Sequence, residues 1–198
     1  NQDAYKNIRK NMLEDKPCLE CNKCYEQERS GFMSMRNSSN KNFGQHIAEV
    51  DMTKEDGQHP EMKIRYWDVR FSNICQLRCR SCGSIFSSRW YDDDIKLNNG
   101  VPLRPRVQFA GRHELDIWEQ MQEHIPYLEQ IYWAGGEPLI TEEHYILLEE
   151  MIRTGKSEHI QLRYNTNMSN LKFKDKDLIS LWKNFKKRIM IYASIDHY

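Results

Sequence analysis

The chain has 198 residues, of which 39% are apolar, and its 29 basic and 29 acidic side chains give a formal net charge of zero. A chain of this length holds one domain, or one domain with a small appendage. The balanced charge argues against a surface for nucleic acid or anionic membrane, and no apolar run is long enough to span a bilayer as a helix. No secretory signal pattern opens the sequence. We therefore expect a cytoplasmic protein that binds neither nucleic acid nor membrane.

Two segments of different character follow each other along the chain. Apolar spacing predicts a short helix over residues 1–15, whereas residues 16–60 are polar and rich in Asn, Ser, Gln and Lys, which predicts an irregular segment. Pro60 closes this stretch. We expect a cysteine-containing N-terminal segment over residues 1–60 and a core domain over residues 61–198.

The core domain alternates between predicted strands and helices. In chain order we expect a strand at 64–72, helices at 84–98 and 113–125, a strand at 130–134, a helix from 141 to 155, a strand at 159–165, a helix at 178–185 and a strand at 188–195. Such alternation predicts a parallel sheet with helices outside it, and hence the α/β class. A closed barrel needs more strands than four. We therefore expect a partial parallel (β/α) barrel that is truncated at the C-terminus.

Three cysteines stand directly after the first predicted strand, in the pattern C-x-x-x-C-x-x-C: Cys75, Cys79 and Cys82. Thiolates are soft ligands that select iron–sulfur clusters and zinc. Three thiolates can hold three irons of a 4Fe-4S cluster and leave the fourth iron open to a ligand. Ligands also bind outside the carboxyl ends of parallel strands, where this loop is predicted to lie.

Other interpretations of these cysteines stay open. A zinc site needs four ligands, and since no His lies between residues 60 and 112, the fourth would be remote. Inert core cysteines are a further alternative. The six cysteines of the chain also allow disulfides, but cysteines two or three residues apart seldom pair with each other, and a signal-free chain is expected in a reducing compartment.

Four segments together resemble the radical S-adenosylmethionine superfamily. The run NICQLRCRSCG (73–83) resembles its cluster loop, and WAGGEP (133–138) resembles its glycine-glycine-glutamate motif after the second strand. YNTN (164–167) and ASID (193–196) resemble its third-strand and fourth-strand segments. All four occur in the superfamily's order, each at the end of a predicted strand, and they cover about residues 64–198.

The resemblance implies a 4Fe-4S cluster on the three cysteines, whose unique iron is chelated by the amino and carboxylate groups of S-adenosylmethionine. It implies contacts to this cofactor from Gly135, Gly136, Glu137, Pro138, Asn165, Asn167, Ser194 and Asp196. Reductive cleavage of the cofactor would then give a 5′-deoxyadenosyl radical that abstracts hydrogen from an unidentified substrate. Taken singly, the same residues also predict an ordinary turn, the end of a strand and a helix cap.

One position departs from the superfamily's pattern. Members usually have an aromatic or bulky apolar residue before the third cysteine, against the adenine, but this chain has Ser81. Arg80 and Ile85 are the sequence's candidates to cover part of the adenine instead.

A second triplet, Cys18, Cys21 and Cys24, lies in the N-terminal segment as C-x-x-C-x-x-C. It resembles part of a ferredoxin ligand run without the closing Cys-Pro. The run CNKCYEQERSGFMSMR (21–36) also resembles the segment before the core domain in twitch or SPASM-like members, where cysteines ligate an auxiliary iron–sulfur cluster. Another ligand would have to precede the first residue. Zinc is the main competitor, with His46 or His59 as ligands.

Three functions remain in competition. The chain is expected to be a radical S-adenosylmethionine enzyme, a zinc-binding structural or interaction module, or an iron–sulfur electron carrier. The glycine-glycine-glutamate run favours the enzyme because neither alternative has a use for it. Such an enzyme needs a reductant such as ferredoxin or flavodoxin, and the twitch-like resemblance suggests a peptide or small-molecule substrate.

Overall fold

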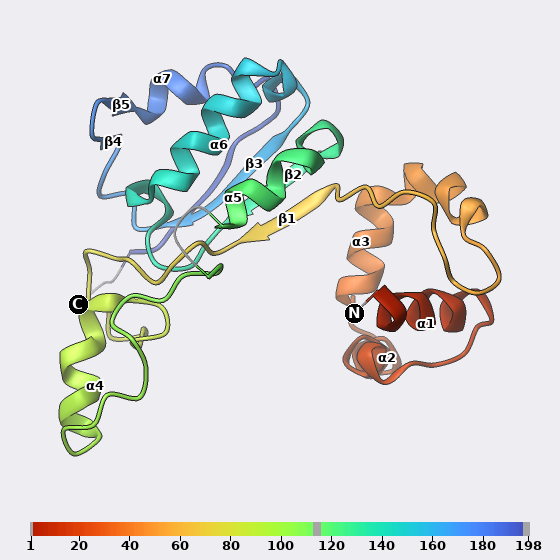
Figure 1. Ribbon diagram of the computed structural model, residues 1–198, viewed down its shortest axis with the longest axis horizontal. Coiled ribbons are helices and arrows are strands. Elements are labelled where there is room, and N and C mark those ends of the chain that lie inside the picture. Colours follow the sequence, from red (N-terminus) through yellow and green to blue (C-terminus); the bar gives the residue numbers. More distant parts are fainter. Residues whose placement is uncertain (1, 113–115, 196–198) are drawn as a thin grey trace. The chain divides into compact units, whose positions relative to one another are not determined.

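The protein is seen in a computed structural model that describes residues 2–112 and 116–195 (Figure 1). The chain divides into two compact units, residues 1–62 and 63–198, so the division falls two residues after Pro60. Within the described ranges, no helix is both long enough and apolar enough to cross a membrane.

The first unit is largely helical. It contains helices α1 (Gln2–Leu13), α2 (Asn22–Arg29) and α3 (Met35–Phe43) and the 3-10 segments η1 (Leu19–Cys21) and η2 (Gly44–Met52). The first predicted helix is confirmed. The prediction of an irregular segment over residues 16–60 was wrong, because this range contains α2, α3 and two 3-10 segments. Polar side chains that are typical of loops cap these helices and form hydrogen bonds between them.

A polar network explains how these short helices are fixed. Ser34 is almost fully buried and caps α3, its Oγ accepting from the backbone N–H of Asn37 at 3.1 Å. The Ser34 hydroxyl in turn donates to the carboxylate of Glu28, which also accepts from Nε of Arg36 at 3.1 Å. The Arg36 guanidinium lies 4.8 Å from the ring centroid of Tyr25. Capping of this kind contributes about 0.5–2 kcal/mol, enough to stabilise a helix of low intrinsic propensity.

The second unit is built on a four-stranded parallel sheet, which confirms the α/β class. Its strands lie in the order β1 (Tyr66–Val69), β2 (Gln130–Trp133), β3 (Gln161–Thr166) and β6 (Met190–Ala193). A short antiparallel hairpin of β4 (Lys172–Phe173) and β5 (Lys176–Asp177) precedes the last helix. All four predicted strands are present; each is shortened at one or both ends, and β3 also extends one residue beyond the predicted range, to Thr166.

Helices cover one face of this sheet, as Figure 1 shows for α5 (Asp116–Met121), α6 (Glu142–Arg153) and α7 (Leu178–Trp182). Every second side chain of β1, β2 and β3 enters the core beneath them, among them Trp67, Val69, Ile131, Trp133, Leu162 and Tyr164. Each large apolar side chain buried in this way stabilises the fold by about 1.5–3 kcal/mol. The intervening residues face the other way and remain exposed or half-buried, so the second face of the sheet is polar and open.

Some helix boundaries differ from those predicted. Between 84 and 98 the chain forms a 3-10 turn, η3 (Ser88–Trp90), and then α4 (Tyr91–Leu97) instead of one continuous helix. The expected helix over 113–125 is described from Asp116 onward and passes into the 3-10 segment η4 (Gln122–Tyr127); residues 113–115 lie outside the described ranges. Pro126 explains the change, because proline cannot supply the backbone N–H that an α-helix needs.

Candidate functional site

The second cysteine triplet lines a cavity of about 280 Å³ at the carboxyl ends of the strands. Its thiols, those of Cys75, Cys79 and Cys82, come from the loop that follows β1. A backbone hydrogen bond of 3.1 Å, from the N–H of Cys82 to the carbonyl of Cys79, closes a tight turn between the last two. One short loop therefore brings all three cysteines to the lining of one cavity.

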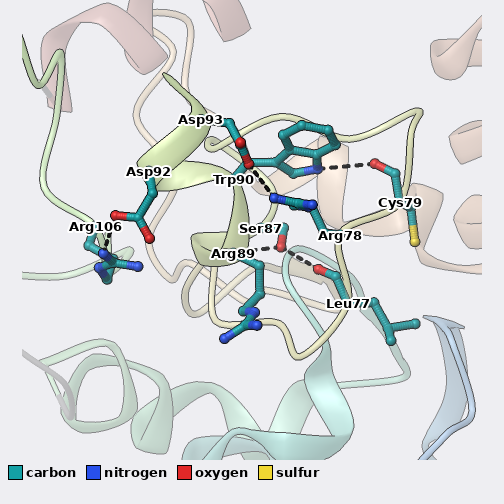
Figure 2. A network of polar contacts seen from close by, with 9 residues as sticks. All are labelled: Leu77, Arg78, Cys79, Ser87, Arg89, Trp90, Asp92, Asp93 and Arg106. Atoms are coloured by element: carbon teal, nitrogen blue, oxygen red, sulfur yellow. Dashed lines mark hydrogen bonds and ion pairs between the residues drawn. The ribbon is translucent and has the colours of Figure 1, made fainter. Parts of the chain in front are cut away.

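Side chains from η3 and α4 hold this loop in shape (Figure 2). The Ser87 hydroxyl donates to the carbonyl of Leu77 at 2.7 Å, and the indole N–H of Trp90 donates to the carbonyl of Cys79 at 3.0 Å. Arg78 forms an ion pair of 2.6 Å with Asp93, and its guanidinium lies 5.3 Å from the Trp90 ring centroid. These contacts fix the loop backbone without using any of the sulfur atoms.

The entry to the loop is fixed by a buried asparagine. Asn73 donates from Nδ2 to the carbonyls of Ser84 (2.7 Å) and Arg106 (3.0 Å). Its Oδ1 accepts from the backbone N–H of Gln108 at 2.9 Å. Both the amide nitrogen and the amide oxygen of Asn73 thus form hydrogen bonds with backbone groups, which favours asparagine at this position.

A glycine turn after β2 closes against the cysteine loop. Gly135 and Gly136 have φ values of +72° and +41°, which L side chains rarely adopt. A Cβ added to Gly136 would lie 2.3 Å from the carbonyl oxygen of Ile74, and one added to Gly135 would lie 2.7 Å from Cβ of Arg70. The sequence predicted these glycines from their motif, and the structure supplies the physical requirement for them.

The carboxylate of Glu137 ties this turn to the end of β3. It is 1% exposed and accepts three hydrogen bonds: from the hydroxyl of Thr166 (2.5 Å), the backbone N–H of Asn167 (2.8 Å) and the backbone N–H of Leu139 (3.1 Å). An ionised carboxylate has about four acceptor sites, so these three hydrogen bonds leave about one of them unused, and Glu137 also lines the cavity. The backbone N–H of Glu137 donates to Ile74 at 2.8 Å.

The remaining predicted cofactor residues fall into three groups. Asn165, Asn167 and Ser194 line the same cavity, on β3 and just after β6. Pro138 does not line it; this buried residue begins the 3-10 turn η5 (Pro138–Ile140). Asp196 lies outside the described residues.

Several lining residues were missed by sequence reasoning. Neither Arg80 nor Ile85 lines the cavity, whereas Phe86 and Leu77 do and give it apolar surface. Phe86 lies five residues after Ser81, the position where the superfamily usually has its aromatic or bulky apolar residue, and was therefore not considered. A weak signal existed, since Phe86 is an aromatic residue only four positions after Cys82.

The donor set at this cavity consists of three thiols, which are soft ligands suited to iron–sulfur clusters and to zinc. In the described ranges, no three His, Cys, Asp or Glu side chains converge closely enough to hold one ion. A zinc ion needs four ligands around one centre, but an iron–sulfur cluster presents separate iron atoms to separate thiolates. Three cysteines that line one cavity supply the ligand type that such a cluster needs for three of its irons. Burial raises the pKa of the Cys75 thiol, partly offset by hydrogen bonds from Leu77 and Ser87, so metal binding has to displace its proton.

The first triplet is arranged along consecutive helical turns. Cys18 precedes η1, Cys21 precedes α2, and Cys24 lies in the first turn of α2. Burial, and then the neighbouring Cys21, raise the pKa of Cys18, so these two thiols are close together. The expected histidine ligands are engaged elsewhere: both ring nitrogens of His59 contact carbonyl oxygens, at 2.5 and 3.2 Å, and His46 contacts Gln45 at 3.4 Å.

Comparison of the chain with protein-family models, curated proteins and solved structures finds no match. The geometry of the cavity and the motifs that line it are therefore the observations that bear on function.

Replacing Glu137 by glutamine should lower the free energy of unfolding by about 1–3 kcal/mol, because an amide N–H₂ would oppose one of three buried donors. Urea unfolding followed by circular dichroism measures this. The matched control is Glu142→Gln, whose half-exposed carboxylate pairs with Lys174 at 2.8 Å and should contribute no more than about 0.5 kcal/mol. Equal effects of the two substitutions would contradict the role of the Glu137 carboxylate in holding the glycine turn to the end of β3.

Proposed function

We propose that the chain is a radical S-adenosylmethionine enzyme whose second unit is a partial barrel. One observation supports this most strongly: residues from four motifs, spread from Cys75 to Ser194, line a single cavity at the carboxyl ends of parallel strands. A structural zinc module or an electron carrier would need the cysteines but not the glycine turn or the asparagines. Enzymes on parallel sheets bind their ligands at this edge.

In this proposal the three cysteines hold a 4Fe-4S cluster and leave one iron for the amino and carboxylate groups of the cofactor. The cluster would supply one electron to the sulfonium, so that the carbon–sulfur bond yields methionine and a 5′-deoxyadenosyl radical, which takes a hydrogen atom from the substrate. The protein would orient the cofactor and exclude side reactions.

The chain's own residues have distinct roles in this proposal. The glycine turn lets backbone approach the methionine part of the cofactor, because no Cβ fills the space. The remaining acceptor site of Glu137 suits its ammonium group. Asn165, Asn167 and Ser194 offer polar groups to the ribose, and Phe86 with Leu77 offers apolar surface to the adenine.

The proposal includes two kinds of partner. Cluster reduction needs a one-electron donor of the ferredoxin or flavodoxin type, and the hydrogen donor is a peptide or a small molecule. An auxiliary iron–sulfur cluster on Cys18, Cys21 and Cys24 is a further part of the proposal, and the engaged histidines disfavour zinc there.

The test uses the full chain, reconstituted with iron and sulfide without oxygen. We expect a brown protein with a reduced-cluster signal in electron paramagnetic resonance. S-adenosylmethionine should change that signal, and dithionite with the cofactor should release 5′-deoxyadenosine. A colourless protein, or a complete cluster whose signal is unchanged by the cofactor, would overturn the proposal.

A further inference from the structure

The polar face of the sheet continues directly from the cavity. Three strand ends contribute Ala134, Asn165 and Ser194 to the cavity lining. Alternate residues of a strand share a face, so the residues two positions earlier on the same strands lie about 6.5 Å farther along this face: Tyr132, Arg163 and Tyr192. Tyr132 pairs with Arg163 in the register of β2 and β3, and itself lines the cavity.

Arg163 lies between the two tyrosines. Its guanidinium carbon is 5.7 Å from the ring centroid of Tyr132 and 5.7 Å from that of Tyr192, and its Nη2 donates to the Tyr192 hydroxyl at 3.2 Å. Its Nε is buried and has no hydrogen-bond partner among the described residues. A buried donor without a partner costs about 1–3 kcal/mol, so a small shift of the side chain that brings Nε against a ligand oxygen would be favourable.

The charge of Arg163 is also uncompensated within the described part of the chain. No carboxylate there forms an ion pair with it, whereas Arg70, at the cavity wall, is neutralised by Asp68 through two contacts of 3.1 Å. Among the described residues of this face, Arg163 is therefore the cation that no carboxylate neutralises. A guanidinium binds planar oxyanions through two parallel hydrogen bonds.

We propose that Arg163, flanked by Tyr132 and Tyr192, binds a carboxylate group of the substrate. This inference rests on the proposed function and specifies its substrate class. One positive charge matches a carboxylate of charge −1 better than a phosphate monoester, which has a charge of about −1.5 to −2 at neutral pH. The rings of Tyr132 and Tyr192 flank the guanidinium, so a planar ligand group would approach along the edge of the guanidinium.

Arginine side-chain NMR of the ¹⁵N-labelled full chain, prepared without oxygen, tests this directly. Acetate is the probe, inorganic phosphate is the comparison, and both are titrated into iron-free and reconstituted protein. We expect acetate to shift the Arg163 Nε–H signal and to bind more tightly than phosphate. Arg163→Gln should weaken acetate binding at least tenfold, while Arg89→Gln, which alters an exposed arginine outside this face, should leave it unchanged.

Two results would overturn the assignment. Acetate binding that survives Arg163→Gln, or tighter binding of phosphate than of acetate, would remove the carboxylate site. Weakening of S-adenosylmethionine binding by Arg163→Gln to the same extent as acetate would assign Arg163 to the cofactor instead of the substrate. Acetate binding through Arg163 in a chain that binds no S-adenosylmethionine would refute the proposed function and keep the carboxylate site.

Discussion

Replacing Cys79 by alanine should remove the cluster signal of the core cavity and reduce 5′-deoxyadenosine release to background. Two remaining thiolates can hold only two irons, so the cluster loses one of the three protein ligands that the proposal gives it. The change should leave the fold largely intact, because the Trp90 indole donates to the backbone carbonyl of residue 79 at 3.0 Å, and alanine retains this carbonyl. Iron analysis, electron paramagnetic resonance and product assay measure the effect.

The other triplet supplies a matched control. Cys24→Ala removes a thiol of similar half-burial from the first unit and should leave both the core-cavity signal and 5′-deoxyadenosine release in place. Should Cys79→Ala retain the cluster signal while Cys24→Ala loses it, the catalytic cluster would belong to the first triplet and the assignment of the core cavity would fail.

The fold of the second unit is largely readable from the sequence. Alternating burial along a strand, as in Gln161–Thr166, leaves a period-two pattern that needs no tertiary knowledge. The order of the motifs at strand ends also predicts that they meet, because parallel strands end at one edge. The cavity that Cys75 and Asn167 both line, 92 residues apart, is what this reasoning predicts.

Other features depend on contacts that periodicity does not encode. Thr166 lies between the predicted cofactor residues Asn165 and Asn167. Unlike them it is buried, and its hydroxyl donates to Glu137. The residue types alone do not predict this hydrogen bond between Thr166 and Glu137, which are 29 positions apart in the sequence. The first unit was misread for a related reason: Ser34 and Asn37 are typical loop residues whose hydrogen bonds form the start of a helix here. Arg163 was overlooked because a single arginine in a strand has no motif.

Replacing Gly136 by alanine should weaken S-adenosylmethionine binding and destabilise the second unit together. The new Cβ would lie 2.3 Å from the carbonyl oxygen of Ile74, far inside contact distance, and that carbonyl also accepts the 2.8 Å hydrogen bond from Glu137. The cysteine loop and the glycine turn would have to separate. We expect at least a tenfold loss of cofactor affinity by calorimetry, which corresponds to about 1.4 kcal/mol.

Gly155 offers the comparison that isolates this contact. It has a φ of +70°, also unfavourable for alanine, but an added Cβ would meet nothing within 4 Å. Gly155→Ala should therefore cost only the left-handed backbone energy, about 1–2 kcal/mol, and should not change cofactor affinity. Backbone strain alone would lower stability equally in both variants and leave S-adenosylmethionine binding untouched. A selective loss of binding in Gly136→Ala would instead come from the close packing of two loops, which is the condition for the cysteines and the cofactor residues to share one cavity.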